Sequence, residues 1–420
     1  MKKLTLTLLI STFGLCAWAT NAQDALNFYK QELTSFPTQN SRATRAYAVA
    51  LADGLQTWLQ QNEKHASTPE VLLWQARLFT QAGRNGQALV TLFKLRYMFP
   101  QTDRTQLTSI WGENINVIDY KLQDSATQLF AQGPTEKAAF VEQKEAEMLY
   151  ALSKLSGDEF YPAAAQAFEN FFVRHPFYER NNEVELWYGD LHRGNKNYLA
   201  AIAQYKKADA LYPNSPYKAA SLRLIGDIYA DNLKNTAAAT EAYTTVLRLY
   251  PNSSETGIVY KHMAILDENN KQYDSALINY DKAIELLGDS SAVYEAYRGK
   301  ADVYTKTNQH ENAYNVLHRA AELSNISKEQ AADALAEAAK IAHKKLKDET
   351  KYVQSLEKAV LLAPNDPKTA QRMCEIGDSY TKQGKLAKAQ EVYKKLILQF
   401  PTSKYASSAQ GKLTRLQNTK

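Results

Sequence analysis

Cysteine, glycine and proline are scarce in this chain of 420 residues, and each scarcity narrows the possible fold. There are 2 cysteines, and Cys16 lies in an N-terminal segment that we expect to be removed. Cys374 would then have no partner for an intramolecular disulfide. The 16 glycines and 12 prolines leave long stretches without a residue that breaks helices. The sequence therefore predicts long helices stabilised by apolar burial, with prolines at the ends of the helices.

The chain also lacks a strong excess of charge of either sign. Its formal net charge is +5, and two of these charges, Lys2 and Lys3, belong to the N-terminal segment. An excess of this size is too weak to indicate nucleic acid or an anionic membrane as a partner. Net charge alone thus points to no polyanionic ligand.

The common sequence motifs of enzymes are missing as well. The chain has no HExxH, GxxxxGK or GxSxG pattern, and its 7 histidines form no cluster at metal-ligand spacing. A single cysteine in a helical pattern, such as Cys374, usually serves as a small apolar residue. We therefore predict that the protein is not an enzyme and has no catalytic, cofactor-binding or metal-binding residues. A hydrolase with paired carboxylates is the alternative that one sequence leaves open.

Only one long apolar run is present, and it lies at the N-terminus. A positively charged start is followed by the apolar segment 4–18 and by small residues up to Ala22. This order is typical of a signal peptide, which we assign to residues 1–22, with Gln23 as the first mature residue. A lipid anchor on Cys16 is not expected, because a lipobox requires a small residue directly before the cysteine and Leu15 stands there. No other segment reaches the roughly 20 apolar residues of a membrane helix, so we predict an exported chain without a transmembrane segment.

A bulky residue followed by proline recurs along the chain. The pairs are Phe99-Pro100, His175-Pro176, Tyr212-Pro213, Tyr250-Pro251, Ala363-Pro364 and Phe400-Pro401. Three of the intervals between successive prolines are 37, 38 and 37 residues long, and the others fit whole numbers of the same unit. A fixed period of this length indicates stacked supersecondary units that bind partners along an extended surface.

Each unit repeats the same residue types when its terminal proline is counted as position 32. Small residues recur at positions 8 and 20 and aromatic residues at 11 and 24; in the last unit these are Gly377, Ala389, Tyr380 and Tyr393. Small side chains let two antiparallel helices cross closely, and the aromatic rings fill the space beside the crossing. This is the tetratricopeptide pattern. It predicts an all-α fold, a right-handed α-solenoid of about eight to ten helix pairs.

The tetratricopeptide pattern is clear in the C-terminal part of the chain and weak in the N-terminal part. We predict N-terminal divergent repeat-like helices at 23–144 and a tetratricopeptide array at 145–420. Residues 102–143 keep helical spacing without the repeat signature, and we interpret them as a divergent unit. In the unit that ends at Pro251, one residue is inserted between the two helices.

The C-terminal sequence carries a more specific resemblance. The segments GDSYTKQGKLAKAQEVYKKLILQFP at 377–401 and FPTSKYASSAQGKLTRL at 400–416 resemble periplasmic tetratricopeptide proteins of the Gram-negative envelope. The families most alike are the Tol–Pal-associated coordinator and the lipoprotein of outer-membrane β-barrel assembly. The resemblance covers 145–420 well and 66–100 more weakly, and the chain lacks the lipobox of the second family and the N-terminal coiled coil of the first. It implies a periplasmic location and protein partners, among them envelope or outer-membrane proteins.

In this architecture the first helix of each pair lines a concave groove. The groove residues that we predict to bind a partner are Asp190, Arg193, Arg223, Asp227, Lys261, Arg298, Asp302 and Asp378. Arg223 and Asp227 are four residues apart, as are Arg298 and Asp302, so local ion pairs are the simpler interpretation. The other interpretation is a mixed-charge groove that holds an extended peptide or a partner helix.

Three functions agree with these observations. The first is an exported, non-enzymatic scaffold that mediates protein–protein interactions in the periplasm. The second is a glycan-binding subunit or enzyme of cell-wall or polysaccharide metabolism, and the third is a component of a secretion or pilus system. Exposed aromatic residues with carboxylates between them would favour the glycan, and a long mixed-charge groove would favour the protein partner.

Overall fold

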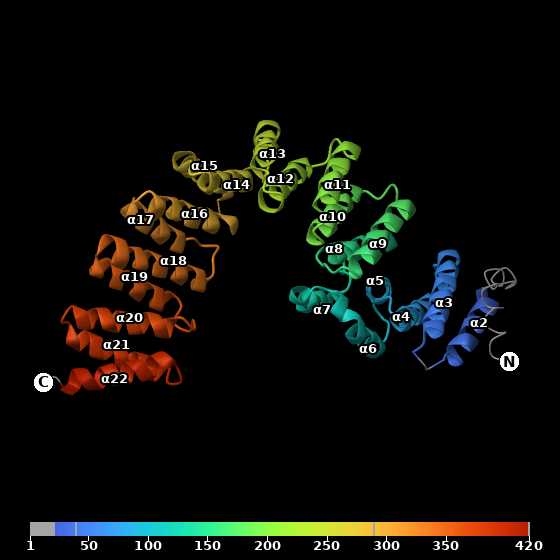
Figure 1. Ribbon diagram of the computed structural model, residues 1–420, viewed down its shortest axis with the longest axis horizontal. Helices are drawn as coiled ribbons and strands as arrows, with labels where there is room; N and C mark the ends of the chain where they lie inside the picture. Colours follow the sequence, from blue (N-terminus) through green and yellow to red (C-terminus); the bar gives the residue numbers. More distant parts are fainter. Residues whose placement is uncertain (1–21, 38–39, 289, 419–420) are drawn as a thin grey trace. The chain divides into compact units, whose positions relative to one another are not determined.

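The computed structural model of the protein describes residues 22–37, 40–288 and 290–418 (Figure 1). All regular elements in these residues are helices. Of the signal peptide predicted at 1–22, only Ala22 falls within the described residues, and the rest lies outside them. The chain forms two compact units, residues 1–221 and 222–420, which are described separately below.

Unit 1 consists of helices that pack against their neighbours in the sequence. They are α2 (Ala22–Thr34), α3 (Arg42–Gln61), α4 (Thr68–Ala82), α5 (Asn85–Met98), α6 (Arg104–Asn114), α7 (Gln123–Gln132), α8 (Val141–Ser153), α9 (Phe160–Arg174), α10 (Asn181–Gly194) and α11 (Tyr198–Leu211). Helix α12 (Lys218–Asp227) begins at the end of this unit and continues into the next.

Unit 2 repeats the same arrangement. Its further helices are α13 (Thr236–Leu249), α14 (Thr256–Asn269), α15 (Tyr273–Leu287), α16 (Ala292–Lys306), α17 (His310–Ala321), α18 (Lys328–Ile341), α19 (Glu349–Leu362), α20 (Thr369–Lys382), α21 (Leu386–Gln399) and α22 (Lys404–Asn418). Taken two at a time, α2 to α21 give ten pairs in the described residues. The predicted all-α fold of stacked helix pairs is confirmed, and the even-numbered helix is the first of each pair.

Glycine and tyrosine form the crossing within three of the pairs, as the pattern predicts. The rings of Tyr205, Tyr243 and Tyr393 are buried, and each lies directly on the glycine at position 8 of the first helix, which is Gly189, Gly226 or Gly377. A Cβ atom on any of these glycines would lie closer than 3.0 Å to the ring. The absence of a side chain at position 8 is therefore what allows the ring to sit there.

The inserted residue before Pro251 is accommodated inside the first helix. At its end, α12 widens into one π-helical turn, η4 (Ile228–Asn232), with the N–H of Leu233 donating to the carbonyl of Ile228 at 3.0 Å. A second π-helical turn, η5 (Ala342–Leu346), ends α18 in the same way. A π turn takes up one extra residue while the rest of the helix keeps its face. Both pairs therefore keep their packing.

The divergent segment 102–143 contains α6 and α7, joined by two 3₁₀ turns at Ile115–Val117 and Tyr120–Leu122. The rings of Trp111 in α6 and Phe130 in α7 are stacked 4.3 Å apart. The two helices have only 11 and 10 residues, and a Cβ atom on Gly112 would meet nothing within 4 Å. This pair therefore lacks the close glycine–tyrosine crossing of the clear repeats.

Among the helices described between residues 22 and 418, none combines the length and apolar character required to cross a membrane.

Candidate functional site

The first helices of three successive pairs in unit 2 enclose a hollow of about 400 Å³. Helices α16, α18 and α20 supply its lining, and we call it the α16–α20 hollow. Its lining residues are Tyr294, Glu295, Arg298, Gln330, Asp333, Ala336, Glu337, Lys340, Lys368, Gln371, Arg372 and Glu375. First helices line the concave face in this architecture, so the hollow lies where the sequence predicts a groove.

The lining is balanced in charge, with four acidic and four basic side chains. Salt bridges link the helices across it. Arg298 of α16 donates to Glu337 of α18 at 2.8 Å, and Arg372 of α20 donates to Asp333 of α18 at 2.6 Å. The lining is thus a set of charges that connect the three helices.

Arg372 forms the floor of the hollow. Its side chain is only 4% exposed, and it donates at 2.8 Å to Asp366, whose side chain is 5% exposed. Asp366 also accepts at 2.9 Å from the backbone N–H of Lys368, the residue directly before α20. A buried arginine held by two carboxylates is costly to leave unpaired, so this part of the lining has a structural role.

Other lining side chains remain available to a ligand. Glu295 and Lys340 are exposed and form no ion pair within the described residues. Gln330 and Gln371 are exposed amides with partners of their own: Gln330 accepts from the N–H of Ser327, and Gln371 accepts from Tyr405 and donates to Glu375. One carboxylate and one ammonium therefore remain to recognise the charged side chains of a peptide.

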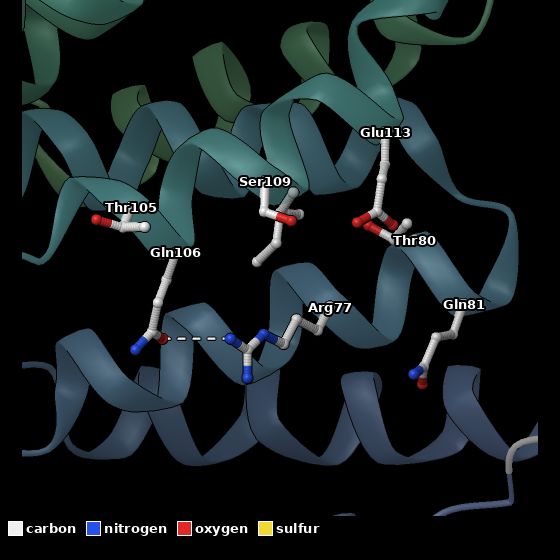
Figure 2. Close-up of a pocket in the computed structure, with 8 residues that line it drawn as sticks. Arg77, Thr80, Gln81, Thr105, Gln106, Ser109 and Glu113 are labelled. Atoms are coloured by element: carbon white, nitrogen blue, oxygen red, sulfur yellow. Dashed lines mark hydrogen bonds between the residues drawn. The ribbon is translucent and has the colours of Figure 1, made fainter.

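A second hollow, of about 430 Å³, lies in unit 1 between the first helices α4 and α6 (Figure 2). Arg77 and Glu113 are its charged residues, and threonine, serine and glutamine make up most of the remainder. Arg77 donates to Gln106 across the hollow at 3.2 Å. The sequence analysis did not predict this site, because α6 lacks the repeat signature.

Arg298 is the one predicted groove residue that lines the α16–α20 hollow. Its suggested local pair with Asp302 is not formed: Arg298 pairs with Glu337, which offers both carboxylate oxygens to the guanidinium. Asp302 has no ion pair within the described residues. Burial, followed by the charges of Glu268 and Glu337, raises the pKa of Asp302.

Three other predicted aspartates, all at position 9, bind the buried tyrosine of their own pair. The hydroxyls of Tyr205, Tyr243 and Tyr393 donate to Asp190, Asp227 and Asp378 at 2.8, 2.8 and 2.7 Å. A second partner comes from a neighbouring pair: Lys154, His262 and Lys412, at 3.8, 2.7 and 2.6 Å respectively. Each aspartate therefore joins two adjacent pairs.

Asp227 shows the electrostatics of this arrangement. Burial alone would raise its pKa, but the hydrogen bond from His262 and the charge of Arg223 hold the pKa below its usual value. The predicted ion pair of Arg223 with Asp227 is formed, and Arg223 also pairs at 2.5 Å with Glu255, the N-cap residue of α14. Burial and the nearby carboxylate raise the pKa of Tyr243. The charged form of Asp227 is thus part of the folded structure.

The remaining predicted residues differ in their surroundings. Arg193 pairs with Asp190 at 3.3 Å, within α10. Lys261 of α14 is half-buried and forms no ion pair in the described part of the chain. Five of the eight predicted residues therefore hold the repeats together: Asp190, Asp227 and Asp378, and the two arginines that pair with them, Arg193 and Arg223.

The residues that sequence reasoning missed lie on α18 and α20. Asp333, Glu337, Lys340 and Arg372 all line the hollow. The extra residue of η5 shifts α18 by one place when units are aligned on their terminal prolines. If this unit is aligned with Ala339 at position 8, the charged side chains of α18 fall on the concave face.

Family comparison agrees with this geometry. Two family models, both described as tetratricopeptide repeat, match the chain, one at residues 155–216 and the other at 220–253 and 375–403. The chain contains tetratricopeptide repeats. The matched segments include α10 and α11, α12 and α13, and most of α20 and α21, which are the three pairs with the glycine–tyrosine crossing.

Several solved structures of repeat proteins are similar to parts of the chain. The C-terminal part of a TPR repeat-containing protein from Cytophaga hutchinsonii is 14% identical, with a TM-score of 0.45, over 63% of this chain and 97% of that chain. A tetratricopeptide repeat protein from Parabacteroides merdae is 15% identical, with a TM-score of 0.37, over 66% and 98%. PilF of Pseudomonas aeruginosa is 14% identical, with a TM-score of 0.36, over 56% and 98%. No curated protein matches the sequence.

Proposed function

We propose that this tetratricopeptide protein is an exported, non-enzymatic scaffold of the bacterial envelope that holds a protein partner in the periplasm. Tetratricopeptide repeats mediate protein–protein interaction, and the α16–α20 hollow is the observation that carries the proposal for this chain. Its lining comes from three successive first helices, so a ligand lying in it would contact three repeats at once. The N-terminal segment, with the features of a signal peptide, supports export.

The chemistry of the lining suits an extended peptide or an exposed partner helix. Five of the eight charged side chains are occupied in salt bridges, from Arg298 to Glu337 and from Arg372 and Lys368 to Asp333. A sixth, Glu375, accepts hydrogen bonds from Tyr352 and Gln371. Glu295 on α16 and Lys340 on α18 are left with opposite charges on neighbouring helices. A segment that places a basic group by Glu295 and an acidic group by Lys340 would be complementary, and a segment in the reverse orientation would be repelled. The hollow thus favours one direction of binding.

Site-specific crosslinking in cells tests the groove. A photoreactive amino acid in place of Gln371 or Lys340 should yield a defined covalent adduct with a protein. The same amino acid in place of Lys358 or Lys394, exposed on the second helices α19 and α21, should not. The charge reversal Lys340→Glu should weaken the Gln371 adduct at least several-fold, while Lys358→Glu leaves it unchanged. Equal adducts at all four positions, or adducts only at the control positions, would contradict a partner in the hollow.

Export is tested separately. The N-terminal peptide of the protein recovered from cells should begin at Gln23, and the protein should appear in the periplasmic fraction. A protein that retains residues 1–22 and stays in the cytoplasm would refute the location but not the groove. A lipid-modified N-terminus at Cys16 would show anchoring in place of release.

A further inference from the structure

The turn between the two helices of a pair carries lysine where the backbone favours glycine. At this position the residue adopts positive φ, and glycine occupies it at Gly83 and Gly384. In four other pairs it is Lys196, Lys234, Lys271 or Lys347, with φ of 62, 54, 62 and 56°. Lysine is strained in this conformation and glycine is not. Strain repeated at the exposed tip of a turn suggests that the lysine has a role other than folding.

Lysines are concentrated at the last two such turns of unit 2. Lys344 and Lys345 lie in the π turn η5 that ends α18, and Lys347 follows it. Lys382 is the last residue of α20, Lys385 lies in the turn that follows, and Lys388 is in the first turn of α21. We call these six the lysine edge. All six are exposed. The two turns are neighbours, because Ser379 at the end of α20 donates to Glu349 at the start of α19 at 2.6 Å.

The positive charge of the lysine edge is only partly offset, by the action of Lys382 on Glu349 and of Lys388 on Glu391. None of the six lysines forms an ion pair within the described residues. The nearby carboxylates have other partners: Asp348 caps α19 by accepting from the N–H of Lys351, and Glu349 binds His343 as well as Ser379. The next carboxylate along α21, Glu391, pairs with Lys395. Although the net charge of the chain is small, the lysine edge is a strongly positive patch.

We propose that the lysine edge docks the protein on a bilayer surface that carries anionic phospholipid headgroups. Lysines close to such a surface each contribute to binding by attraction that needs no fixed geometry. The six side chains fit this mode, because they are ammonium groups on long stems; Lys385 and Lys388 lie over the ring of Tyr380, 5.9 and 5.5 Å from its centroid, and can leave it at little cost. Leu386, whose exposed fraction is 41%, follows Lys385 directly and can enter the headgroup region between the lysines.

A bilayer accounts for these features better than an acidic polypeptide does. Recognition of particular carboxylates favours arginine, whose planar fork binds them in a defined geometry, and the lysine edge contains no arginine. An exposed leucine among lysines is also typical of membrane-surface segments. The lysine edge lies at the helix turns, whereas the α16–α20 hollow lies on the faces of first helices. The inference therefore does not depend on the proposed partner site.

Vesicle sedimentation tests the proposal with the chain purified as cells process it. We expect it to sediment with vesicles of phosphatidylglycerol and phosphatidylcholine, to stay in solution with phosphatidylcholine alone, and to bind more weakly as salt is raised. Each lysine at a membrane surface contributes about a factor of five, so K344Q/K345Q/K385Q/K388Q should bind several hundred-fold more weakly. Binding to both kinds of vesicle with equal affinity would overturn the proposal. So would binding to polyglutamate but not to the anionic vesicles at the same salt concentration.

Two further variants separate docking from general charge and from folding. K328Q/K358Q/K394Q/K404Q removes the same charge from exposed lysines away from the lysine edge, and its binding should fall far less. Lys347→Gly relieves the strained turn, so it should raise the urea midpoint while weakening vesicle binding about five-fold. An equal loss of binding in the two quadruple variants, or unchanged binding in Lys347→Gly, would show that the lysine edge does not dock.

Discussion

Gly377→Ala gives a direct test of the crossing between α20 and α21. The new Cβ would lie closer than 3.0 Å to three ring atoms of Tyr393, which is buried and cannot swing aside. Either the ring or the helix must then move. In both cases the hydrogen bond from Tyr393 to Asp378 lengthens from 2.7 Å. One methyl group should therefore disturb both the packing and the charge pairing of this pair.

The size of the effect follows from three opposing contributions. Alanine favours a helix interior over glycine by about 1 kcal/mol. Overpacking a filled site costs about 1–3 kcal/mol, and weakening a hydrogen bond to a carboxylate costs up to about 1.5–3 kcal/mol. We expect Gly377→Ala to lower the free energy of unfolding by about 2 kcal/mol. Gly411→Ala in α22 is the matched control, because its Cβ meets nothing within 4 Å. It should stabilise the protein by about 0.5–1 kcal/mol.

Urea unfolding followed by circular dichroism measures both variants, and hydrogen exchange of α20 and α21 amides shows where stability is lost. Exchange is needed because the stability of a repeat array is a sum of local terms. In a Tyr393→Leu background, the ring is gone and Gly377→Ala should cease to destabilise, giving a coupling energy of about 1–3 kcal/mol. If Gly377→Ala stabilises the protein as much as Gly411→Ala does, the ring of Tyr393 does not require glycine at position 377, and this explanation of the crossing is wrong.

Two further predictions concern buried polar contacts. Tyr243→Phe removes one hydrogen-bond donor from Asp227 but leaves Arg223 and His262 beside it, so it should lower the free energy of unfolding in urea by about 1–2 kcal/mol. Its control is Tyr405→Phe, which removes an exposed hydroxyl and should change stability by less than about 0.5 kcal/mol. Glu145→Gln should cost about 3 kcal/mol at pH 7, because the carboxylate is only 2% exposed and pairs with Arg174. The folded pKa of Glu145 lies below 4.5, so its contribution is complete above pH 4.5 and is lost as the pH falls through the folded value. The difference between Glu145→Gln and the unchanged protein should therefore shrink below pH 4.5, and a difference that grows there would contradict this assignment.

Much of the fold could be predicted from the sequence, because the tetratricopeptide pattern records steric requirements. A glycine under a tyrosine ring, as in Gly226 and Tyr243, is visible in the sequence as residue type at fixed spacing. The one-residue insertion after Gly226 was also visible, although its form as a π turn was not. The pair α6–α7 was recognised only as helical, because its helices are short, 11 and 10 residues, and are joined by two 3₁₀ turns.

The candidate site was less predictable. Position 9 was chosen because first helices face the groove, and three of the four aspartates there proved to bind tyrosines of their own pairs. Such a bond joins residues about 15 apart on two helices, and no single-helix rule reveals it. Arg298 was placed correctly in the hollow, but its partner Glu337 lies 39 residues away on the next first helix. Pairing between helices depends on the register of the stack, which one π turn in α18 shifts.

The aspartates at position 9 and the lining residues of the α16–α20 hollow differ for a general reason. A charged residue that recurs in several repeats can meet the same neighbour each time, as Asp190, Asp227 and Asp378 each meet the tyrosine of their own pair. Asp302 recurs at the same position, but its pair has no tyrosine in that place, and it forms no ion pair in the described residues. A ligand meets each repeat once, so the residues that recognise it need not recur. Glu295 and Lys340 differ in charge and in position within their helices, and neither forms an ion pair in the part of the chain that the structure describes. Residues that depart from the repeat, and not those that define it, are therefore where binding specificity in this protein should be sought.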